Sequence, residues 1–159
     1  MPSNSANVIL AAQCFHWFAN ADSVAEIHRI LKPKGMLGII WNLPDRSVSW
    51  IKAIEEMLDV KFTENKVSRP EDSDIFQHIE NHAGFGPENS ECSYHHTMEL
   101  DSVIERYKAV SVVAAAESHE KEAMLSRIEK EVTTNYPDVK DQGKYIYSFK
   151  IKIYWFQKN

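Results

Sequence analysis

The sequence lacks the features that would assign a chain of 159 residues to several large classes of protein. Its two cysteines, Cys14 and Cys92, form no CxxC pair, so the sequence indicates neither a disulfide framework nor a cysteine-rich zinc site. The longest apolar run, near residues 36–41, is far shorter than the roughly 20 residues that cross a bilayer. We therefore expect no membrane-spanning segment.

The sequence also lacks a strong excess of basic residues. Lys and Arg number 18 against 23 Asp and Glu, which gives a formal net charge of −5 and no basic footprint for nucleic acid. The first residues, MPSNSANVIL, contain neither the basic nor the apolar segment of a secretory leader. We expect a cytoplasmic protein without nucleic-acid or membrane partners. Because 43% of the residues are hydrophobic, we expect a single domain over residues 1–159.

What the chain does have, close to its start, is a strand–helix–strand pattern. The run from Val8 to Ala12 is continuously apolar, as is the run at 36–41, which is typical of parallel strands covered on both faces. Apolar residues at helical spacing lie between them, from Ala21 onward, and Pro33 and Gly35 end the helix. Such a unit is normally parallel.

The rest of the chain alternates between helical and extended patterns. A helix is expected at 49–58, and residues 62–87 are polar and irregular, with a short helix at 74–81 and a turn at 84–87. A strand at 91–100 precedes a helix capped by Asp101 and a second helix that begins at Ser118. The strong alternation at 145–156 predicts a final antiparallel strand.

Two segments carry a resemblance to a known family. AAQCFHWF, residues 11–18, is followed by EIHRILKPKGMLGIIWN, residues 26–42, and HAGFGP, CSYHHTMEL and YSFKIKIYWFQK continue the likeness. These segments resemble the class I S-adenosylmethionine-dependent methyltransferases, in the type-11-like branch with an FHWF segment after its fourth strand. The resemblance implies an α/β, Rossmann-like sheet of order 3-2-1-4-5-7-6, of which this chain matches only strands 4 to 7. We expect a mixed sheet of order 4-5-7-6 with an antiparallel last strand and helices on both faces.

The absent strands 1 to 3 would carry the family's glycine-rich cofactor turn and the acidic residue that holds the ribose. The chain has five glycines, and they form neither GxGxxG nor GxGxG. GFG at 84–86 lies in a polar loop and is not a cofactor loop. The resemblance implies S-adenosylmethionine as cofactor, whereas the residues of this chain argue against its binding the cofactor alone.

The resemblance places one group of residues beside the sulfonium of the cofactor: Ala12, Gln13, Phe15, His16 and Trp17. An aromatic wall suits a sulfonium because a cation is attracted to the face of a ring. The competing interpretation is that Phe15, Trp17 and Phe18 pack in the core at the start of a helix.

The acceptor-binding positions implied by the resemblance are His16, Trp41 and Asn42, since strand ends at the carboxyl edge of a sheet bind ligands. Asn42 alternatively starts the turn NLPD. His16 could be a base toward an acidic acceptor, but methyl transfer to a carboxylate needs no base, so no catalytic residue is assigned. The sequence predicts no metal site, because His78 and His82 have metal spacing without a third ligand.

Without strand 1, the strand from Val8 to Ala12 becomes an uncovered sheet edge, and we expect a homodimer or a partner chain to pair there. Three interpretations follow: a methyltransferase fragment acting on a small molecule; a non-catalytic methyltransferase-like binding or regulatory subunit that associates through this strand; and an unrelated α/β binding domain. FHWF together with LKPKG argues against the third.

Overall fold

The structure is a computed structural model that describes residues 1–67, 69, 76–82, 84–138 and 140–159. The chain forms two compact units. Unit 1 comprises residues 1–43, 68–92 and 150–159, and unit 2 comprises residues 44–67 and 93–149. Each unit has a hydrophobic core of its own. None of the helices in the described ranges is long and apolar enough to cross a membrane.

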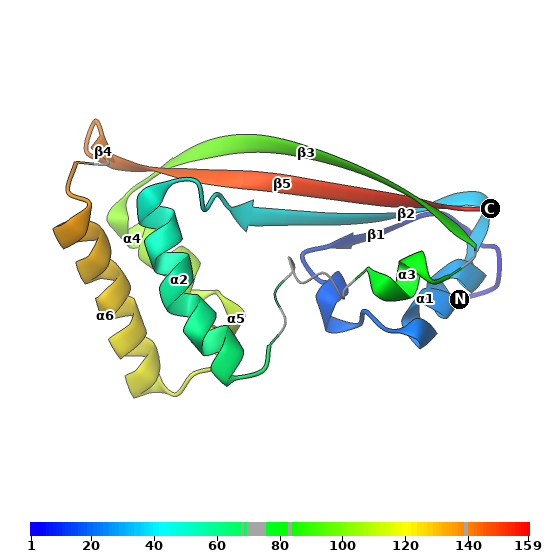
Figure 1. Ribbon diagram of the computed structural model, residues 1–159, viewed down its shortest axis with the longest axis horizontal. Helices are drawn as coiled ribbons and strands as arrows, with labels where there is room; N and C mark the ends of the chain where they lie inside the picture. The colour runs from blue at the N-terminus through cyan, green and yellow to red at the C-terminus, as the bar shows by residue number, and fades with distance from the viewer. Residues whose placement is uncertain (68, 70–75, 83, 139) are drawn as a thin grey trace. The chain divides into compact units, whose positions relative to one another are not determined.

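The helices and strands expected from the sequence follow one another in the expected order, and a short helix at Ser111–Ala114 and a short strand at Lys140–Asp141 are additional (Figure 1). The elements are β1 (Ala6–Ala12), the 3-10 turn η1 (Phe15–Trp17), α1 (Ala21–Ile30), β2 (Leu31–Pro44), α2 (Ser49–Glu64), α3 (Gln77–Glu80), β3 (Phe85–Met98), α4 (Leu100–Lys108), α5 (Ser111–Ala114), α6 (Ser118–Asn135), β4 (Lys140–Asp141) and β5 (Lys144–Lys158).

The hydrogen-bonded strand order is β1-β2-β5-β3, with β4 paired to β5. The last strand of the chain therefore lies between the second and the third strand, as in the order 4-5-7-6 that the resemblance implies. The predicted mixed α/β sheet is confirmed. β1 and β2 are parallel, with Val8 opposite Met36 and Ala12 opposite Ile40. β5 runs in the direction opposite to β2 (Figure 1).

Polar contacts stabilise both ends of α1, one from a neighbouring residue and one from a residue distant in the chain. Asn20 caps the start, because its side-chain oxygen accepts the backbone N–H of Ser23 at 2.9 Å. At the other end, the ammonium of Lys158 donates to the carbonyls of His28 and Leu31, at 2.8 Å each. A cation on carbonyls that the helix leaves unpaired also complements the helix dipole.

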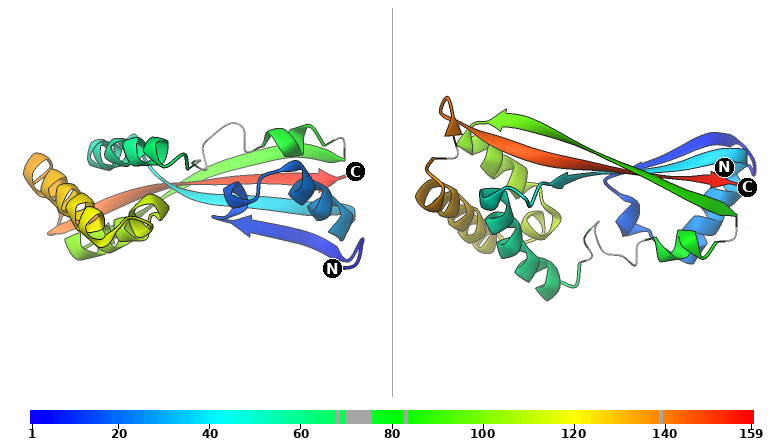
Figure 2. Two further views of the ribbon diagram at one scale, coloured as in Figure 1. Left: turned by 90° about the horizontal axis from the view of Figure 1, so that it is seen from below. Right: turned by 45° about the horizontal axis from the view of Figure 1, so that its top comes forward.

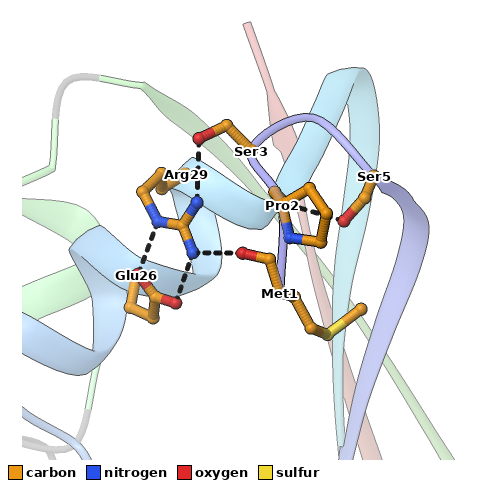
Figure 3. Close-up of polar contacts among 6 residues, drawn as sticks. All are labelled: Met1, Pro2, Ser3, Ser5, Glu26 and Arg29. Carbon is orange, nitrogen blue, oxygen red and sulfur yellow. Dashed lines mark hydrogen bonds and ion pairs between the residues drawn. The ribbon is translucent and has the colours of Figure 1, made fainter.

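An arginine on α1 holds the first residues of the chain (Figure 3). The guanidinium of Arg29 donates to the carbonyl of Met1 at 2.7 Å and to the hydroxyl of Ser3 at 2.8 Å, and it forms a bidentate pair with Glu26. The Arg29 hydrogen bond lowers the pKa of Glu26. These contacts fix the segment that leads into β1.

In unit 1, α1 and α3 lie on the same face of the strands (Figures 1 and 2). The prediction had placed helices on both faces. The core on that face contains alternate residues of β2, among them Leu37, Ile39 and Trp41. On the opposite face Val8 is 54% exposed and Leu10 is 66% exposed. The expectation that the first strand is covered on both faces is therefore wrong, because both side chains are more than half exposed.

Unit 2 packs α2, α4, α5 and α6 around aromatic residues of β5. The hydroxyls of Tyr107 and Tyr147 form a buried hydrogen bond of 2.9 Å, and Trp50 packs edge-on to Tyr147. α2 is longer than the predicted 49–58, because the helical pattern continues with Phe62 among the residues packed on the core.

Several other predicted boundaries are wrong. β2 begins at Leu31, so Pro33 and Gly35, which were expected to end the helix, lie within this strand. β3 begins at Phe85, so only Gly84 remains of the predicted turn at 84–87. The cap residue of α4 is Glu99, and Asp101 lies within the first turn. The short helix predicted at 74–81 is observed as α3, Gln77–Glu80, and residues 74 and 75 lie outside the described residues.

Candidate functional site

Gln13 and Asn42 meet at the edge of unit 1 where the parallel strands β1 and β2 reach their carboxyl ends. The backbone N–H of Gln13 donates to the carbonyl of Ile40 at 2.9 Å, which extends the pairing of the two strands by one residue. The side-chain amide of Gln13 then donates to the carbonyl of Asn42 at 3.2 Å. Gln13 has a φ of 58°, so the chain turns sharply there and leads into η1. The end of a parallel strand pair is where ligands bind in α/β sheets.

The aromatic residues of η1 divide between the core and the surface. Phe15 is fully buried and contacts Phe18 edge-on, with ring centroids 5.3 Å apart, so it serves packing. Trp17 is 61% exposed, and its ring lies 4.8 Å from that of the half-buried His16. Trp17 is therefore the aromatic side chain of this segment that a ligand can reach.

Trp41 and Asn42 face opposite sides of β2, as strand alternation requires. Trp41 is 1% exposed and packs edge-on to Phe76 and Tyr154, with ring centroids 5.5 and 5.9 Å away. It lies in the core of unit 1. Asn42 is half-buried, and Ala12, opposite Ile40, is exposed. Of the residues implied by the resemblance, the structure thus brings Gln13 and Asn42 into contact and buries Phe15 and Trp41.

Three residues define the polar edge, the name used below for Gln13, Asn42 and the exposed Trp17. It offers amide groups and one aromatic face, without a formally charged side chain. The adjacent Cys14 is a free, half-buried thiol. An edge of this kind can orient a ligand by hydrogen bonds and stacking, and it contains no pair of residues for general acid–base chemistry.

The structure brings two histidines together that the sequence pattern does not connect. The rings of His28 and His82 lie 4.5 Å apart, and Phe85 packs edge-on to His28. Burial, followed by the charges of Lys158 and His82, lowers the pKa of His28. In the sequence, His82 has helical spacing to His78 and no visible relation to His28, because only folding brings α1 beside the end of α3. Among the described residues there is no group of three or more potential metal ligands.

Comparison with known proteins shows that the first part of this chain is similar to methyltransferases. The family model described as a methyltransferase domain matches residues 1–39. An uncharacterized methyltransferase-like protein of Schizosaccharomyces pombe is 47% identical over 58 residues, which are 36% of this chain and 23% of that protein. An uncharacterized methyltransferase of Mycobacterium tuberculosis is 33% identical over 73 residues, which are 45% of this chain and 30% of that protein. The matched segments are therefore less than a third of each curated relative.

Solved structures with low sequence identity share the fold. A putative type II methyltransferase from Anaeromyxobacter dehalogenans has a TM-score of 0.62 at 16% identity, covering 100% of this chain and 66% of that chain. A putative methyltransferase from Bacillus halodurans has a TM-score of 0.52 at 19% identity, covering 99% of this chain and 72% of that chain. The chain thus has the α/β fold of these methyltransferases, and its first 39 residues are similar to the methyltransferase domain family.

Proposed function

We propose that this chain is a truncated domain of an S-adenosylmethionine-dependent methyltransferase that acts on a small molecule and lacks the glycine-rich cofactor loop. The observation that carries the proposal is the contact of Gln13 with Asn42 at the carboxyl ends of two parallel strands, beside the exposed ring of Trp17. The polar edge would hold the acceptor and the sulfonium end of the cofactor, because a cation is attracted to an indole face and amides orient polar groups.

A small-molecule acceptor agrees with the size and chemistry of the polar edge, which offers a few amides and one ring and no charged track for a polymer. One solved structure with the same fold is titled loganic acid methyltransferase with S-adenosylhomocysteine; its TM-score is 0.55 at 12% identity. The acceptor of that protein is a small carboxylic acid by its name, and its title includes the demethylated cofactor.

The described residues do not fit the whole cofactor. A glycine serves as a cofactor cradle when ligand atoms can approach where a Cβ would stand. At Gly35, Gly38 and Gly84 a Cβ would instead meet protein atoms, namely backbone carbonyls, the Leu10 side chain and the His28 ring. Gly143, with φ of +83°, has open space around it at the β4–β5 turn. These four glycines therefore provide no cradle, and we derive no catalytic step through the cofactor.

A second candidate function is a non-catalytic methyltransferase-like binding or regulatory subunit that associates through its first strand. The observation that favours it is the exposure of Val8 and Leu10 on β1. Apolar side chains that stay exposed on a regular strand commonly mark an interaction site.

Calorimetric titration of the folded chain with S-adenosylmethionine and S-adenosylhomocysteine distinguishes the two functions. The methyltransferase proposal predicts binding that Trp17→Ala weakens about tenfold, the effect of losing a cation–π contact of about 1.4 kcal/mol. Val60→Ala, an equally exposed position on α2 in unit 2, is the matched control and leaves binding unchanged. Absence of binding in a chain shown to be folded would reject cofactor use by this chain and favour the subunit function.

A further inference from the structure

The short helix α3 depends on tertiary contacts. A helix of four residues is not stable by itself, because fixing its first turn costs more than so few hydrogen bonds return. α3 lies beside α1 (Figures 1 and 2), and Ile79 is fully buried in the core of unit 1. Phe76, directly before the helix, packs against Tyr154 and edge-on to Trp41, with ring centroids 4.4 and 5.5 Å away.

Two histidines connect the other end of α3 to α1. His82 follows the helix, and its ring lies 4.5 Å from that of His28 in the last turn of α1. Phe85 packs edge-on to His28 at 5.4 Å, and the His28 ring fills the space in which a side chain at Gly84 would stand. Both imidazole rings are half-buried. The pair is called the histidine contact below.

The hydrogen bonding of His82 requires a neutral ring. The backbone N–H of Gly84 donates to Nδ1 of His82 at 3.3 Å. An imidazole nitrogen accepts a hydrogen bond only while it carries no proton, whereas both nitrogens of an imidazolium are donors. Protonation of His82 therefore removes this bond and brings two N–H groups against each other.

A positive charge already lies beside the histidine contact. The ammonium of Lys158 on β5 donates to the carbonyl of His28 at 2.8 Å. Burial, followed by the charges of Lys158 and His82, lowers the pKa of His28. Like charges repel each other more strongly in a partly buried contact than in water, because the effective dielectric constant is lower. Protonation of both rings would therefore place three positive charges close together.

The other titratable groups of the neighbouring helices do not offset this repulsion. On α1, the carboxylate of Glu26 is held in a bidentate pair with Arg29. On α3, the titratable side chains are His78 and the exposed Glu80. Within the described ranges, no carboxylate is among the charges that act on the His28 ring.

We propose that the histidine contact is an acid-sensitive switch, which holds α3 against α1 while both rings are neutral and releases α3 when they take up protons. Release of α3 also withdraws Phe76, the residue before it, from Trp41 near the end of β2. The inference goes beyond the proposed methyltransferase function and does not depend on cofactor binding.

Hydrogen exchange of the full chain, compared at about pH 7.5 and about pH 5, tests the switch. The amides of Ile79, Glu80 and Asn81 donate within the turn of α3, so their protection factors report whether α3 is formed. They should be less protected than the amides of β2 at both pH values, because α3 opens while β2 stays paired. At the lower pH their protection factors should fall about tenfold or more, while β2 remains protected. Protection of α3 that equals that of β2, or that does not change with pH, would overturn the proposal.

Substitutions that keep the packing but remove the protons test the assignment to these two rings. His28→Phe keeps a ring against Gly84, and His82→Asn keeps an acceptor oxygen near the position of Nδ1. In the double variant α3 should be equally protected at both pH values, and His82→Asn alone, the milder change, should reduce the fall. His78→Gln removes a histidine of α3 outside the contact and should leave the fall unchanged. A fall of full size in the double variant, or one that His78→Gln abolishes, would reject the switch.

Discussion

The side-chain amide of Gln13 donates to the backbone carbonyl of Asn42, 29 residues further along the chain, with an Nε2 to O distance of 3.2 Å. The bond links the residue after β1 to a residue near the end of β2. It holds together two of the residues assigned to the polar edge. Its geometry depends on the left-handed backbone of Gln13, whose φ is 58°.

The conformation of Gln13 predicts different stabilities for two variants. Gln13→Ala and Gln13→Gly both lose the bond to Asn42, but only alanine retains a Cβ in the left-handed region, at a cost of about 1–2 kcal/mol. We therefore expect the glycine variant to be more stable than the alanine variant by about 1 kcal/mol in urea denaturation. Equal stabilities would contradict the left-handed conformation.

Two glycines of β2 predict unequal responses to the same substitution. A Cβ at Gly35 would lie 2.8 Å from the carbonyl oxygen of Lys32 and 3.1 Å from that of Asn7, and backbone atoms move little. A Cβ at Gly38 would meet the Leu10 side chain, which is exposed and can rotate away. Gly35→Ala should lower the free energy of unfolding by about 1–3 kcal/mol, and Gly38→Ala by less. Thermal denaturation of the two variants side by side measures the difference, and an equal or reversed order would refute the close approach at Gly35.

The buried hydroxyls of Tyr107 and Tyr147 predict non-additive effects in unit 2. Burial raises the pKa of both phenols, so both remain neutral and share one hydrogen bond at physiological pH. Tyr147→Phe leaves the Tyr107 hydroxyl buried without this partner, which costs about 1–3 kcal/mol. The double variant with Tyr107→Phe should cost less than the sum of the two single variants. A double-mutant cycle in urea provides the measurement, and strict additivity would exclude the coupling.

His28 predicts a loss of stability at acidic pH. Its pKa in the folded chain lies below the ordinary value of 6.5, first because of burial and then because of the charges of Lys158 and His82. As the pH falls below about 6.5, the unfolded chain takes up a proton at this position before the folded chain does. The free energy of unfolding should therefore decrease from about pH 6.5 downward, until the folded-state pKa is passed.

His28→Gln should flatten this part of the stability profile, measured by urea denaturation between about pH 5 and 8. His119→Gln on the exposed part of α6 in unit 2 is measured alongside, so that the effect of His28 is compared with that of removing another histidine. The same slope in wild type and His28→Gln would assign the pH dependence to other groups.

The sequence predicted much of the fold because its signals are local. Two apolar runs with a regular apolar helical face between them are sufficient to predict that β1, α1 and β2 exist, although Pro33 and Gly35 lie within β2 and do not mark the end of α1. The strand order came from the resemblance rather than from these signals, since nothing in an isolated strand specifies its neighbour. The turn predicted at 84–87 and the cap predicted at Asp101 are wrong because the local signals in these segments are weak.

The candidate site could be predicted only in part. The resemblance selected Gln13, Trp17 and Asn42, which the structure places at or near the ends of the two parallel strands. The resemblance could not show that Phe15 and Trp41, which it also selected, are buried in the core. Their burial depends on packing against residues distant in the chain.

The sequence by itself therefore determined the types of element, the α/β class and the lack of a GxGxG turn, because each of these depends on neighbouring residues. Only the tertiary structure decided that Val8 and Leu10 stay exposed, that His82 pairs with His28, and that Trp41 lies in a core. Burial is a property of the surroundings, and the surroundings of a side chain come mostly from distant parts of the chain.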